Sequence, residues 1–415
     1  MPIQLTPKQQ EAADKISEFF LNDEPYFVLS GFAGVGKSTV IRFVTEDYMD
    51  KTAKTVKLID KNFHNYPIMV TATTNKAVDV LQNFMPALET STIHVALNLR
   101  VKGKGLIQTR KTVDRAIYIV DEASMINTEL MEFIQSAATK HKAKFLFVGD
   151  PTQLPPVGEA SSPVFNMGYP MVEMTEIMRQ PVGPLRELCE ALRLQVLGTP
   201  MDAVDIDGIE IEWLERDDYK AAILKDMLNP YWTDSQSKSI CYTNAMAIAM
   251  NRMVKTKLTG THKLQRGDYA INNKSLFSPT IRLKTDALVY ISGVTHDVTD
   301  HNTLGCEVHV NGGQVALFVP YDITQKAILE KRALASQDYD LLRYLESHWA
   351  DLRSSYSCTV HKSQGSTYNT VYVDVYDIAK AGNYDLNLMH RLLYVAVSRA
   401  SHKVIFTGEL PDNLL

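Results

Sequence analysis

The sequence has none of the features that mark membrane proteins, secreted proteins or proteins that coat nucleic acid. No apolar run reaches the roughly 18 residues that a membrane-spanning helix needs, and the N-terminus, MPIQLTPKQQ, lacks the charged-then-apolar layout of a signal peptide. The net charge of −5 gives no support to nonspecific coating of nucleic acid, although it leaves room for a local basic groove. We therefore expect a cytoplasmic protein with no membrane partner.

Cysteine is scarce, and the sequence contains no internal repeat or low-complexity tract. The four cysteines are scattered and form no CxxC pair, so reduced, buried thiols are expected rather than disulfides or a zinc site. The 415 residues suffice for two to four domains. The hydrophobic share of 45% and the charged share of 22% are typical of a soluble globular protein.

Short, almost continuous apolar runs occur early in the chain and return near its end. Such runs are typical of parallel strands that helices bury on both faces. A helix is predicted over 6–21, where Thr6 is the N-cap and Pro7 the first helical residue. Two α/β units are therefore expected. Their predicted strands are Tyr26–Ser30, Ile68–Ala72, Ile117–Val120 and Phe145–Val148 in the first, and Ser239–Tyr242, Val371–Val375 and Val404–Thr407 in the second.

The second unit is predicted to carry an insertion. Residues 256 to about 354 contain short alternating segments (LVYISGV, CEVHV and VALFV) separated by Gly and Asn turns, which is typical of a small antiparallel β-domain. A helical stretch is predicted near 326–352. Its apolar residues recur at a spacing of three and four, which indicates core packing: Leu341, Leu342, Leu345 and Trp349.

A phosphate-binding loop follows the first predicted strand. Gly31-x4-Gly36-Lys37-Ser38 (GFAGVGKS) lies between a strand and a helix, which is the context that the motif requires and which disfavours a chance glycine-rich turn. Its glycines let backbone N–H groups wrap phosphates, while Lys37 reaches the β- and γ-phosphates and the Ser38 hydroxyl ligates Mg²⁺. The residues predicted to bind the nucleotide here are Gly34, Val35, Gly36, Lys37, Ser38 and Thr39.

An acidic pair ends the predicted strand at 117–120 and supplies the other half of a hydrolytic site. Asp121 is expected to hold Mg²⁺, and Glu122 to polarise the attacking water as general base. The alternative is an acidic start to the next helix, which the helix dipole would favour. A GTPase is disfavoured, because the segment that starts Asn75-Lys76 has Val78 where a guanine reader needs aspartate. ATP hydrolysis is the predicted chemistry.

Read in order, the motifs from residue 5 to about 408 resemble those of superfamily 1 DNA helicases of the RecD-like branch, its bacteriophage members above all; the resemblance is weakest over 256–354. The segment Leu5-Thr6-x-x-Gln9 is similar to the family's adenine-reading motif, which implies that Gln9 binds the base. Thr6 and Gln9 would also form a capping box at a helix start, and both roles stay open.

The resemblance also supplies residues around the γ-phosphate. Gln153, in Gly149-Asp150-Pro151-x-Gln153, matches the position that senses the γ-phosphate. Arg179 and Arg399 match arginines that reach the same phosphate from the second unit or the hinge and stabilise transition-state charge. Gln364 and Gly365, in the segment 357–366, match residues that face the nucleotide cleft.

Contacts to single-stranded DNA are implied by four further segments. Nonspecific binding of a single strand needs phosphate donors and stacking faces rather than base-edge readers. The matched residues stand where strands end and helices begin, so they are equally good N-cap and turn residues. They are Thr73 and Asn75, Thr92 and His94, Thr243 and Asn244, and Thr359 and His361.

A basic hairpin is predicted in the first unit. Residues 90–113 carry five cations and no acid, and Gly103-Lys104-Gly105 is a plausible tip between two apolar-polar arms. In the family, an inserted hairpin at this place splits incoming duplex. A solvated basic loop is the alternative.

The resemblance implies an α/β fold of two tandem RecA-like P-loop NTPase domains with ATP between them. The predicted divisions are domain 1 at 1–180 with the hairpin near 95–113, domain 2 at 181–255 and 355–415, and the inserted β-domain at 256–354. The implied function is an ATP- and Mg²⁺-dependent DNA helicase that moves 5′-to-3′ on single-stranded DNA and unwinds forked or tailed duplex.

The resemblance further implies a monomer that works with a single-strand-binding protein or other replication proteins in a phage-infected bacterial cytoplasm. Two alternatives stay open. An ATP-gated nucleic-acid-binding or recruitment protein would not unwind, and it would be expected to have lost its catalytic base or its arginines. An RNA helicase is possible because phosphate-gripping motifs do not reveal a contact to the 2′-OH.

Overall fold

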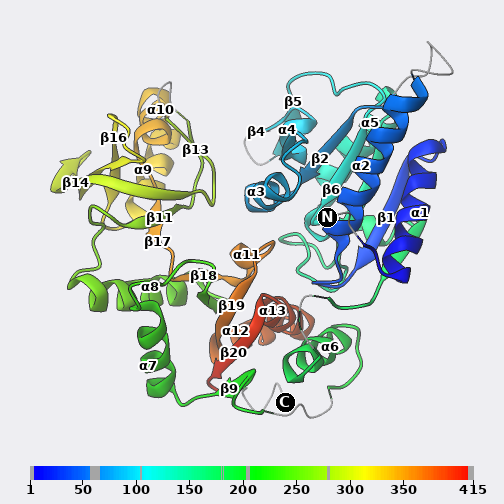
Figure 1. Ribbon diagram of the computed structural model, residues 1–415. Helices are drawn as coiled ribbons and strands as arrows, with labels where there is room; N and C mark the ends of the chain where they lie inside the picture. Colours follow the sequence, from blue (N-terminus) through cyan, green and yellow to red (C-terminus); the bar gives the residue numbers. More distant parts are fainter. Residues whose placement is uncertain are drawn as a thin grey trace.

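The computed structural model describes residues 4–56, 66–102, 105–178, 180, 182–201, 206–277 and 281–409. Figure 1 shows three units: a first unit in blue and cyan, a second unit in green and red, and a yellow β-rich unit joined to the second unit near α8. Among the described residues, no helix is long and apolar enough to cross a membrane. The four cysteines are free and buried.

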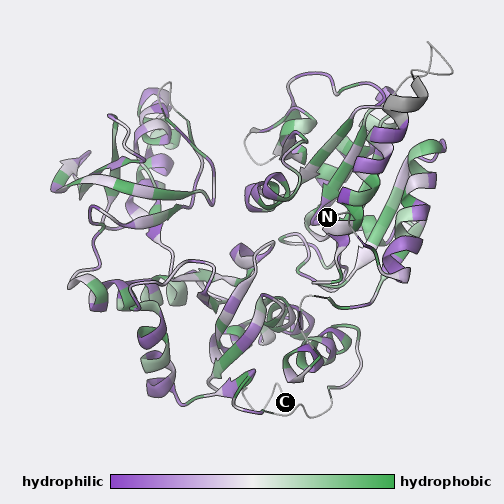
Figure 2. Cartoon of the chain, viewed as in Figure 1, coloured by the Kyte–Doolittle hydropathy of each residue, from purple (hydrophilic) through white to green (hydrophobic). Residues whose placement is uncertain are grey.

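The first unit is built on a parallel sheet of six strands in the order β3-β2-β6-β7-β1-β8. Its central strands are buried on both faces, and Figure 2 shows them in green. The strands are β1 (Tyr26–Gly31), β2 (Ile68–Ala72), β3 (Thr90–Thr92), β6 (Ile117–Asp121), β7 (Lys144–Gly149) and β8 (Met171–Met174).

Helices cover this sheet, and their starts follow the sequence signals. The first helix begins at Pro7 behind the N-cap Thr6, as predicted. The helices are α1 (Pro7–Leu21), α2 (Lys37–Val56), α3 (Asn75–Phe84), α4 (Ile93–Ala96) and α5 (Thr128–His141). An antiparallel hairpin of β4 (Leu99–Lys102) and β5 (Gly105–Gln108) extends from α4.

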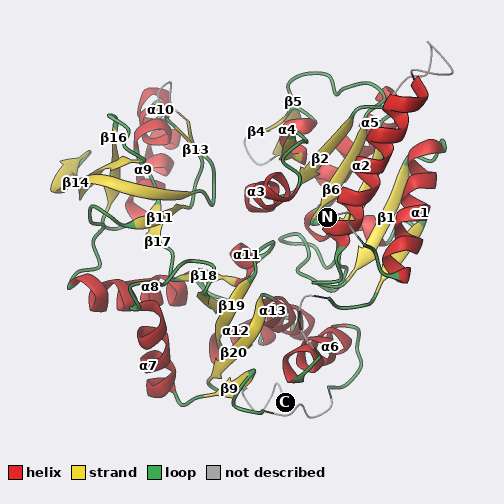
Figure 3. Ribbon diagram, viewed as in Figure 1, coloured by secondary structure: helices red, strands yellow, loops and turns green. Residues whose placement is uncertain are grey.

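The second unit has a parallel sheet of five strands in the order β18-β10-β19-β20-β9. The strands are β9 (Ile211–Trp213), β10 (Ser237–Cys241), β18 (Ser357–Thr359), β19 (Tyr368–Asp374) and β20 (Ala400–Thr407). The helices, drawn red in Figure 3, are α6 (Pro184–Val196), α7 (Arg216–Met227), α8 (Asn244–Thr259), α11 (Val360–Ser363), α12 (Val375–Gly382) and α13 (Leu386–Ser398).

The chain leaves the second unit after α8 and returns at β18, and the β-rich unit lies between. Its main sheet is antiparallel in the order β16-β15-β14-β11-β17, and β12-β13 form a separate pair. The strands are β11 (Tyr269–Asn272), β12 (Leu276–Phe277), β13 (Arg282–Leu283), β14 (Leu288–Asp300), β15 (Thr303–Val310), β16 (Ala316–Pro320) and β17 (Leu352–Ser354).

The helical stretch predicted near 326–352 is two helices rather than one, α9 (Thr324–Ala335) and α10 (Tyr339–His348). The break has a local cause: Gln337 takes a φ of 57°, and the Asp338 side chain accepts from the Leu341 N–H as the cap of α10. Leu345 and Trp349 are fully buried, as the stripe predicted.

The fold is α/β with two RecA-like parallel sheets. In a parallel sheet all carboxyl ends of the strands meet at one edge, and ligands bind beyond that edge. In the first sheet this edge gathers the segments after β1, β2, β6 and β7; in the second it gathers those after β10 and β18. The segments that carry the predicted functional residues after these strands therefore gather at two places, one at the carboxyl edge of each sheet.

Candidate nucleotide cleft and strand groove

The segment after β1 has the geometry of a phosphate loop. Gly34 and Gly36 take φ values of 84° and 85°, which side chains other than glycine rarely adopt. A Cβ on Gly36 would stand 2.5 Å from Gln9 Nε2. Lys37 Nζ donates to the Gly31 and Phe32 carbonyls at 2.7 and 2.9 Å, which holds the ammonium inside the loop that it is predicted to complete.

The two roles predicted for Gln9 can be compared directly. The capping box is present: the Thr6 side chain accepts from the Gln9 N–H, and Gln9 Oε1 accepts from the Thr6 N–H at 3.1 Å. Gln9 Nε2 donates to the Val35 carbonyl at 3.2 Å, so the side chain braces the phosphate loop. Reading of adenine by Gln9 stays a prediction.

The acidic pair lies at the end of β6, as predicted. Burial, with the neighbouring Glu122 charge, raises the pKa of Asp121 to about 7. Glu122 follows in a left-handed turn with φ 54°, and its N–H donates to Asp121 Oδ1 at 2.9 Å. A half-buried carboxylate whose pKa is raised in this way is stabilised by a cation, so Asp121 and the Ser38 hydroxyl, which both line one cavity, fit a Mg²⁺ ion carried by the phosphates. Glu122 faces the same cavity.

A cavity of about 430 Å³ joins these residues to the second unit; we call it the nucleotide cleft. Of the predicted residues it brings together Gly34, Gly36, Lys37, Ser38, Thr39, Asp121, Glu122, Gln153, Gly365 and Arg399. Gln9, Val35 and Gln364 are buried beside it but do not line it. Arg179 lies outside the described residues. An apolar wall from α3, which the sequence did not indicate, includes Val80, Leu81 and Phe84.

Arg399 enters the cleft from the end of α13. Its guanidinium is buried and donates to the Val395 and Ser366 carbonyls and to the Ser398 hydroxyl, all neutral acceptors. None of these three acceptors is a carboxylate, so they leave the guanidinium available to an anion in the cleft.

Several polar atoms at the cleft are buried without a protein partner. Among the side chains that the structure describes, Gln153 Oε1, both polar atoms of Gln364 and the Ser366 hydroxyl are in this state. Leaving a buried polar group unpaired costs roughly 1–3 kcal/mol. Of these three residues only Gln153 lines the cleft, so its unpaired acceptor is the one that suits a polar ligand there, such as a nucleoside triphosphate.

Direct hydrogen bonds also join the two units beside the cleft, and the sequence did not indicate them. The Tyr394 hydroxyl donates to Asp150 Oδ2 at 2.7 Å and accepts from the Ala33 N–H at 3.3 Å. Arg391 Nη1 donates to the Pro151 and Gln153 carbonyls, both at 2.6 Å. Tyr394 lies five residues before Arg399, whose match to the family was the available signal.

A second cavity, of about 1180 Å³, lies between the units; we call it the strand groove. One wall is the loop 155–160 after β7, and the other comes from the second unit. Thr243, Asn244, Thr359 and His361 all line it, because β10 and β18 are neighbours with Cys241 opposite Thr359. Burial lowers the pKa of His361, which favours a neutral imidazole.

The strand contacts predicted in the first unit form a separate group. Ala72 is opposite Thr92 across β2 and β3, which brings the segments of Thr73 and Asn75 next to those of Thr92 and His94. None of these four lines the strand groove as the described residues define it. The Thr73 hydroxyl donates to the Glu122 carbonyl at 3.3 Å, which links this group to the end of β6.

Two protein-family models match the chain, one in its N-terminal half and one near its C-terminus. Residues 4–206 match the model of an AAA domain, and residues 354–407 match that of a UvrD-like helicase C-terminal domain. The chain is 25% identical to the uncharacterized protein R530 of Acanthamoeba polyphaga mimivirus, over 97% of this chain and 99% of R530. It is 25% identical to the probable conjugal transfer protein TraA of Sinorhizobium fredii over 69% of this chain, which spans only 24% of TraA.

Solved structures of Pif1 helicases share the fold. One, on DNA unwinding at forked double-stranded DNA by two coordinating Pif1 helicases, matches with a TM-score of 0.55 and 15% identity. The Pif1 helicase from Bacteroides, in complex with ADP-AlF3 and single-stranded DNA, matches with 0.53 and 15%. Each comparison covers 100% of this chain and 94% of the other. In fold, the chain is similar to these Pif1 helicases.

Proposed function

We propose that this protein is an ATP-driven DNA helicase that moves 5′-to-3′ along single-stranded DNA and unwinds duplex. The observation that carries the proposal is the pair of cavities between the two RecA-like units. The nucleotide cleft receives Lys37 and Glu122 from one unit and Arg399 from the other, and the strand groove is likewise lined from both. A ligand that closes one cavity must therefore alter the other.

The residues of the cleft divide the hydrolytic work. Lys37 and the glycine N–H groups bind phosphates, Ser38 and Asp121 hold Mg²⁺, and Glu122 orients the attacking water. Gln153 senses the γ-phosphate, and Arg399 stabilises the charge that builds in the transition state. Arg179 is proposed as a second such arginine, and Gln364 and Gly365 as the floor on the side of the second unit.

The groove is proposed to hold the phosphates of one strand through Thr243, Asn244, Thr359 and His361. Their side chains can donate hydrogen bonds to phosphate oxygens, and contacts to the backbone rather than to base edges suit sequence-independent binding. Thr73, Asn75, Thr92 and His94 are proposed to hold the strand where it crosses the first unit. The complex of the Bacteroides Pif1 helicase with single-stranded DNA supports this class of ligand.

The finer assignments rest on the sequence resemblance. We place the chain in the RecD-like branch, near the bacteriophage helicase Dda, with the hairpin at 95–113 as the duplex-splitting element. The proposed domains are 1–180, 181–255 with 355–415, and the insertion 256–354. A monomer that meets single-strand-binding or other replication proteins in an infected bacterial cytoplasm completes the proposal.

Strand displacement on tailed duplexes tests the proposal. The substrates are matched DNA and RNA duplexes with a 5′ tail, a 3′ tail or no tail, incubated with ATP and Mg²⁺. We expect displacement of DNA from the 5′ tail only, and none by Lys37→Ala. Displacement from the 3′ tail alone would overturn the polarity and the branch.

The same experiment separates the alternatives. Strand-stimulated ATP turnover without displacement from any tail would identify a recruitment protein that does not unwind. Preference for the RNA substrate would identify an RNA helicase.

A further inference from the structure

Helix α13 reaches from the strand groove to the nucleotide cleft. Leu388 and Arg391, near its start, line the groove, and Arg399, directly after its end, lines the cleft. At 1.5 Å per residue the helix is about 20 Å long. It is therefore one element with a functional side chain at each site.

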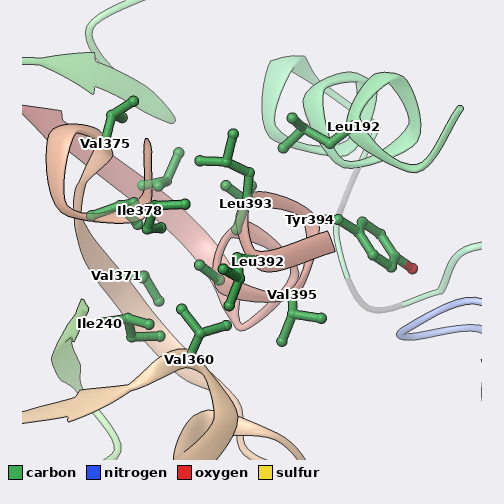
Figure 4. Packing of buried hydrophobic residues seen from close by; sticks show 14 of the residues in the cluster. Leu192, Ile240, Val360, Val371, Val375, Ile378, Leu392, Leu393, Tyr394 and Val395 are labelled. Atoms are coloured by element: carbon green, nitrogen blue, oxygen red, sulfur yellow. The ribbon is translucent and has the colours of Figure 1, made fainter. Parts of the chain in front are cut away.

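The helix is packed firmly into the core of the second unit. Asp385 caps its first turn by accepting from the Leu388 N–H, and its last turns are buried on all sides. Figure 4 shows the aliphatic cluster around Leu392, Leu393 and Val395, into which these side chains point. The ring of Tyr394 instead points away from this cluster, with its hydroxyl at the far end.

The loop opposite the helix, residues 150–160 of the first unit, also reaches both cavities. Gln153 lines the cleft, while Pro155 and the residues up to Ala160 line the groove. The loop and α13 thus run side by side between the same two sites, one from each unit.

Two side chains of α13 fasten it to this loop. Arg391 donates to the carbonyls on both sides of Thr152, at 2.6 Å each, and its Nε donates to Asn387 Oδ1 at 2.7 Å, which fixes the guanidinium on its own helix. One turn on, the Tyr394 hydroxyl joins Asp150 to the Ala33 N–H of the phosphate loop. Burial raises the pKa of Tyr394 well above its usual range, so the hydroxyl stays a donor at all working pH values.

Asp150 is held ready for this contact. It is fully buried, and its Oδ1 accepts from the Thr152 N–H and hydroxyl, which leaves Oδ2 facing Tyr394. A carboxylate buried in this way is strongly stabilised by the hydroxyl donor. The contact therefore depends on the separation of the two units beside the cleft.

We propose that Arg391 and Tyr394 are positioning residues that transmit nucleotide binding to the strand groove. They clamp α13 to the 150–160 loop, so that closure of the cleft around a nucleotide shifts both walls of the groove together. This inference rests on the proposed function, because it needs a strand in the groove. The alternative is a static contact that only holds the two units in place.

The test is the linkage between the two ligands at equilibrium. We would measure the Kd of a fluorescent oligothymidylate by anisotropy, with and without a non-hydrolysable ATP analogue and Mg²⁺. Allosteric coupling factors are typically about 5- to 150-fold, and we expect the wild-type ratio of the two Kd values to fall in that range. In Tyr394→Phe and Arg391→Ala we expect a ratio within about twofold of one.

Reciprocity supplies a second measurement on the same proteins. The strand must change the affinity for the nucleotide analogue by the same factor as the analogue changes the affinity for the strand. We expect that factor to be lost in both variants. Arg343→Ala removes an exposed arginine of α10 and is the charge-matched control, which should keep the wild-type ratio.

The outcomes separate the clamp from a static contact and from the proposed function. A lower melting temperature in Tyr394→Phe with an unchanged ratio would show a static contact and overturn the inference. Because Tyr394→Phe removes one oxygen atom, it keeps the test valid should Arg391→Ala fail to fold. If the wild-type protein binds no strand under either condition, the proposed function falls, and the inference with it.

Discussion

At the residue scale, the chemistry of the cleft depends on where the ends of β6 and α13 place individual charged side chains. Asp121 is the last residue of β6 and is half-buried, whereas Glu122 leaves the strand through a left-handed conformation. Two adjacent carboxylates thereby receive different surroundings, which suits the different roles proposed for them. Arg399 likewise owes its place to the last turn of α13 and not to any charge near it.

Replacing Arg399 by alanine should lower ATP turnover much more than nucleotide binding. Arginines that stabilise the transferring phosphoryl group are worth about 10³- to 10⁵-fold in kcat. We expect a fall of at least about 10²-fold in kcat for Arg399→Ala, with nucleotide affinity within about threefold of wild type. Steady-state ATPase rates and equilibrium binding of a fluorescent ATP analogue check this.

Lys403→Ala is the matched control, because Lys403 follows in β20 and pairs with Glu212 at 2.7 Å on the surface. It should hydrolyse ATP at the wild-type rate. A normal rate in Arg399→Ala would show that this arginine does not act on the γ-phosphate.

The raised pKa of Asp121 predicts a pH-dependent requirement for Mg²⁺. Below about pH 7 the carboxyl is protonated and must lose its proton to bind the ion, so the apparent affinity for Mg²⁺ should fall about tenfold per pH unit below 7 and level off above it. Glu122→Gln removes the neighbouring charge and should move this break to lower pH. Burial remains in the variant, so the pKa should stay above the ordinary aspartate value.

Mg²⁺ titrations of fluorescent ATP-analogue binding between pH 5.5 and 8.5 measure the break in both proteins. Protonation of the nucleotide itself affects both proteins equally, so the difference between the wild-type and Glu122→Gln curves reports on the protein. A wild-type affinity for Mg²⁺ that does not change between pH 5.5 and 8.5 would remove Asp121 as the metal ligand.

At the element scale, the ends of strands serve two purposes at once. Thr92, Thr243 and Thr359 each accept from a backbone N–H three residues on and so cap a helix. A hydroxyl that accepts a capping bond still has a proton to donate to a phosphate. Thr243 donates that proton to Asp377 Oδ1 at 2.8 Å, so this contact must be exchanged before Thr243 can bind a strand phosphate.

The hairpin of β4 and β5 is joined to α5 by a hydrogen bond, which allows its role to be tested. Glu129 Oε1 accepts from the Leu106 N–H at 2.6 Å. Glu129→Ala removes this bond and loosens the β5 arm, and we expect duplex unwinding to fall severalfold while ATP turnover stimulated by single-stranded DNA stays near wild type. The ratio of base pairs displaced to ATP hydrolysed on a 5′-tailed duplex measures this.

Glu132→Ala is the control on the same helix, because Glu132 is an exposed acid of α5. It should unwind normally. Equal loss of unwinding and ATP turnover in Glu129→Ala would argue for general destabilisation of the first unit and against a duplex-splitting hairpin.

At the scale of the whole molecule, the first and second units meet on both sides of the nucleotide cleft. On one side Lys76 Nζ donates to the Tyr368 hydroxyl at 3.2 Å, and on the other Arg391 and Tyr394 hold the 150–153 loop. The β-rich unit joins the second unit and also approaches the first, where Lys284 Nζ lies 3.6 Å from Asp79 Oδ1. Nucleotide binding in the cleft should therefore stabilise the second unit as well as the first.

The positions of tryptophan make this testable. The three tryptophans are Trp213, Trp232 and Trp349, and none lies in the first unit. A non-hydrolysable ATP analogue with Mg²⁺ at about 100 times its Kd should stabilise whatever binds it by about 2.7 kcal/mol. If the cleft joins the units, urea unfolding followed by tryptophan fluorescence should shift to a higher midpoint.

Lys37→Ala should remove the shift, since it weakens binding at the phosphate loop. If the urea midpoint measured by tryptophan fluorescence does not change when the analogue is added to the wild-type protein, the first unit binds the nucleotide without the second.

The sequence by itself determined the secondary-structure elements and the part of the nucleotide site that lies in the first unit. Patterns such as the buried strand that ends in Asp121, or the loop Gly31–Ser38, are local, because a strand and the turn after it are specified by neighbouring residues. The predicted strands of both sheets are present, and the capping box of Thr6 and Gln9 also formed. The exception, the two helices α9 and α10, arose at one residue with positive φ, which a periodicity cannot reveal.

Only the tertiary structure decided which residues meet. Arg391 is 238 residues away from Gln153 and donates to its carbonyl, and Tyr394 is 244 residues away from Asp150. Contacts of this kind depend on how two sheets pack against each other, and no spacing in the sequence encodes that geometry. The phosphate loop could be identified from eight consecutive residues, whereas the second half of its cleft required the fold to bring α13 across to it.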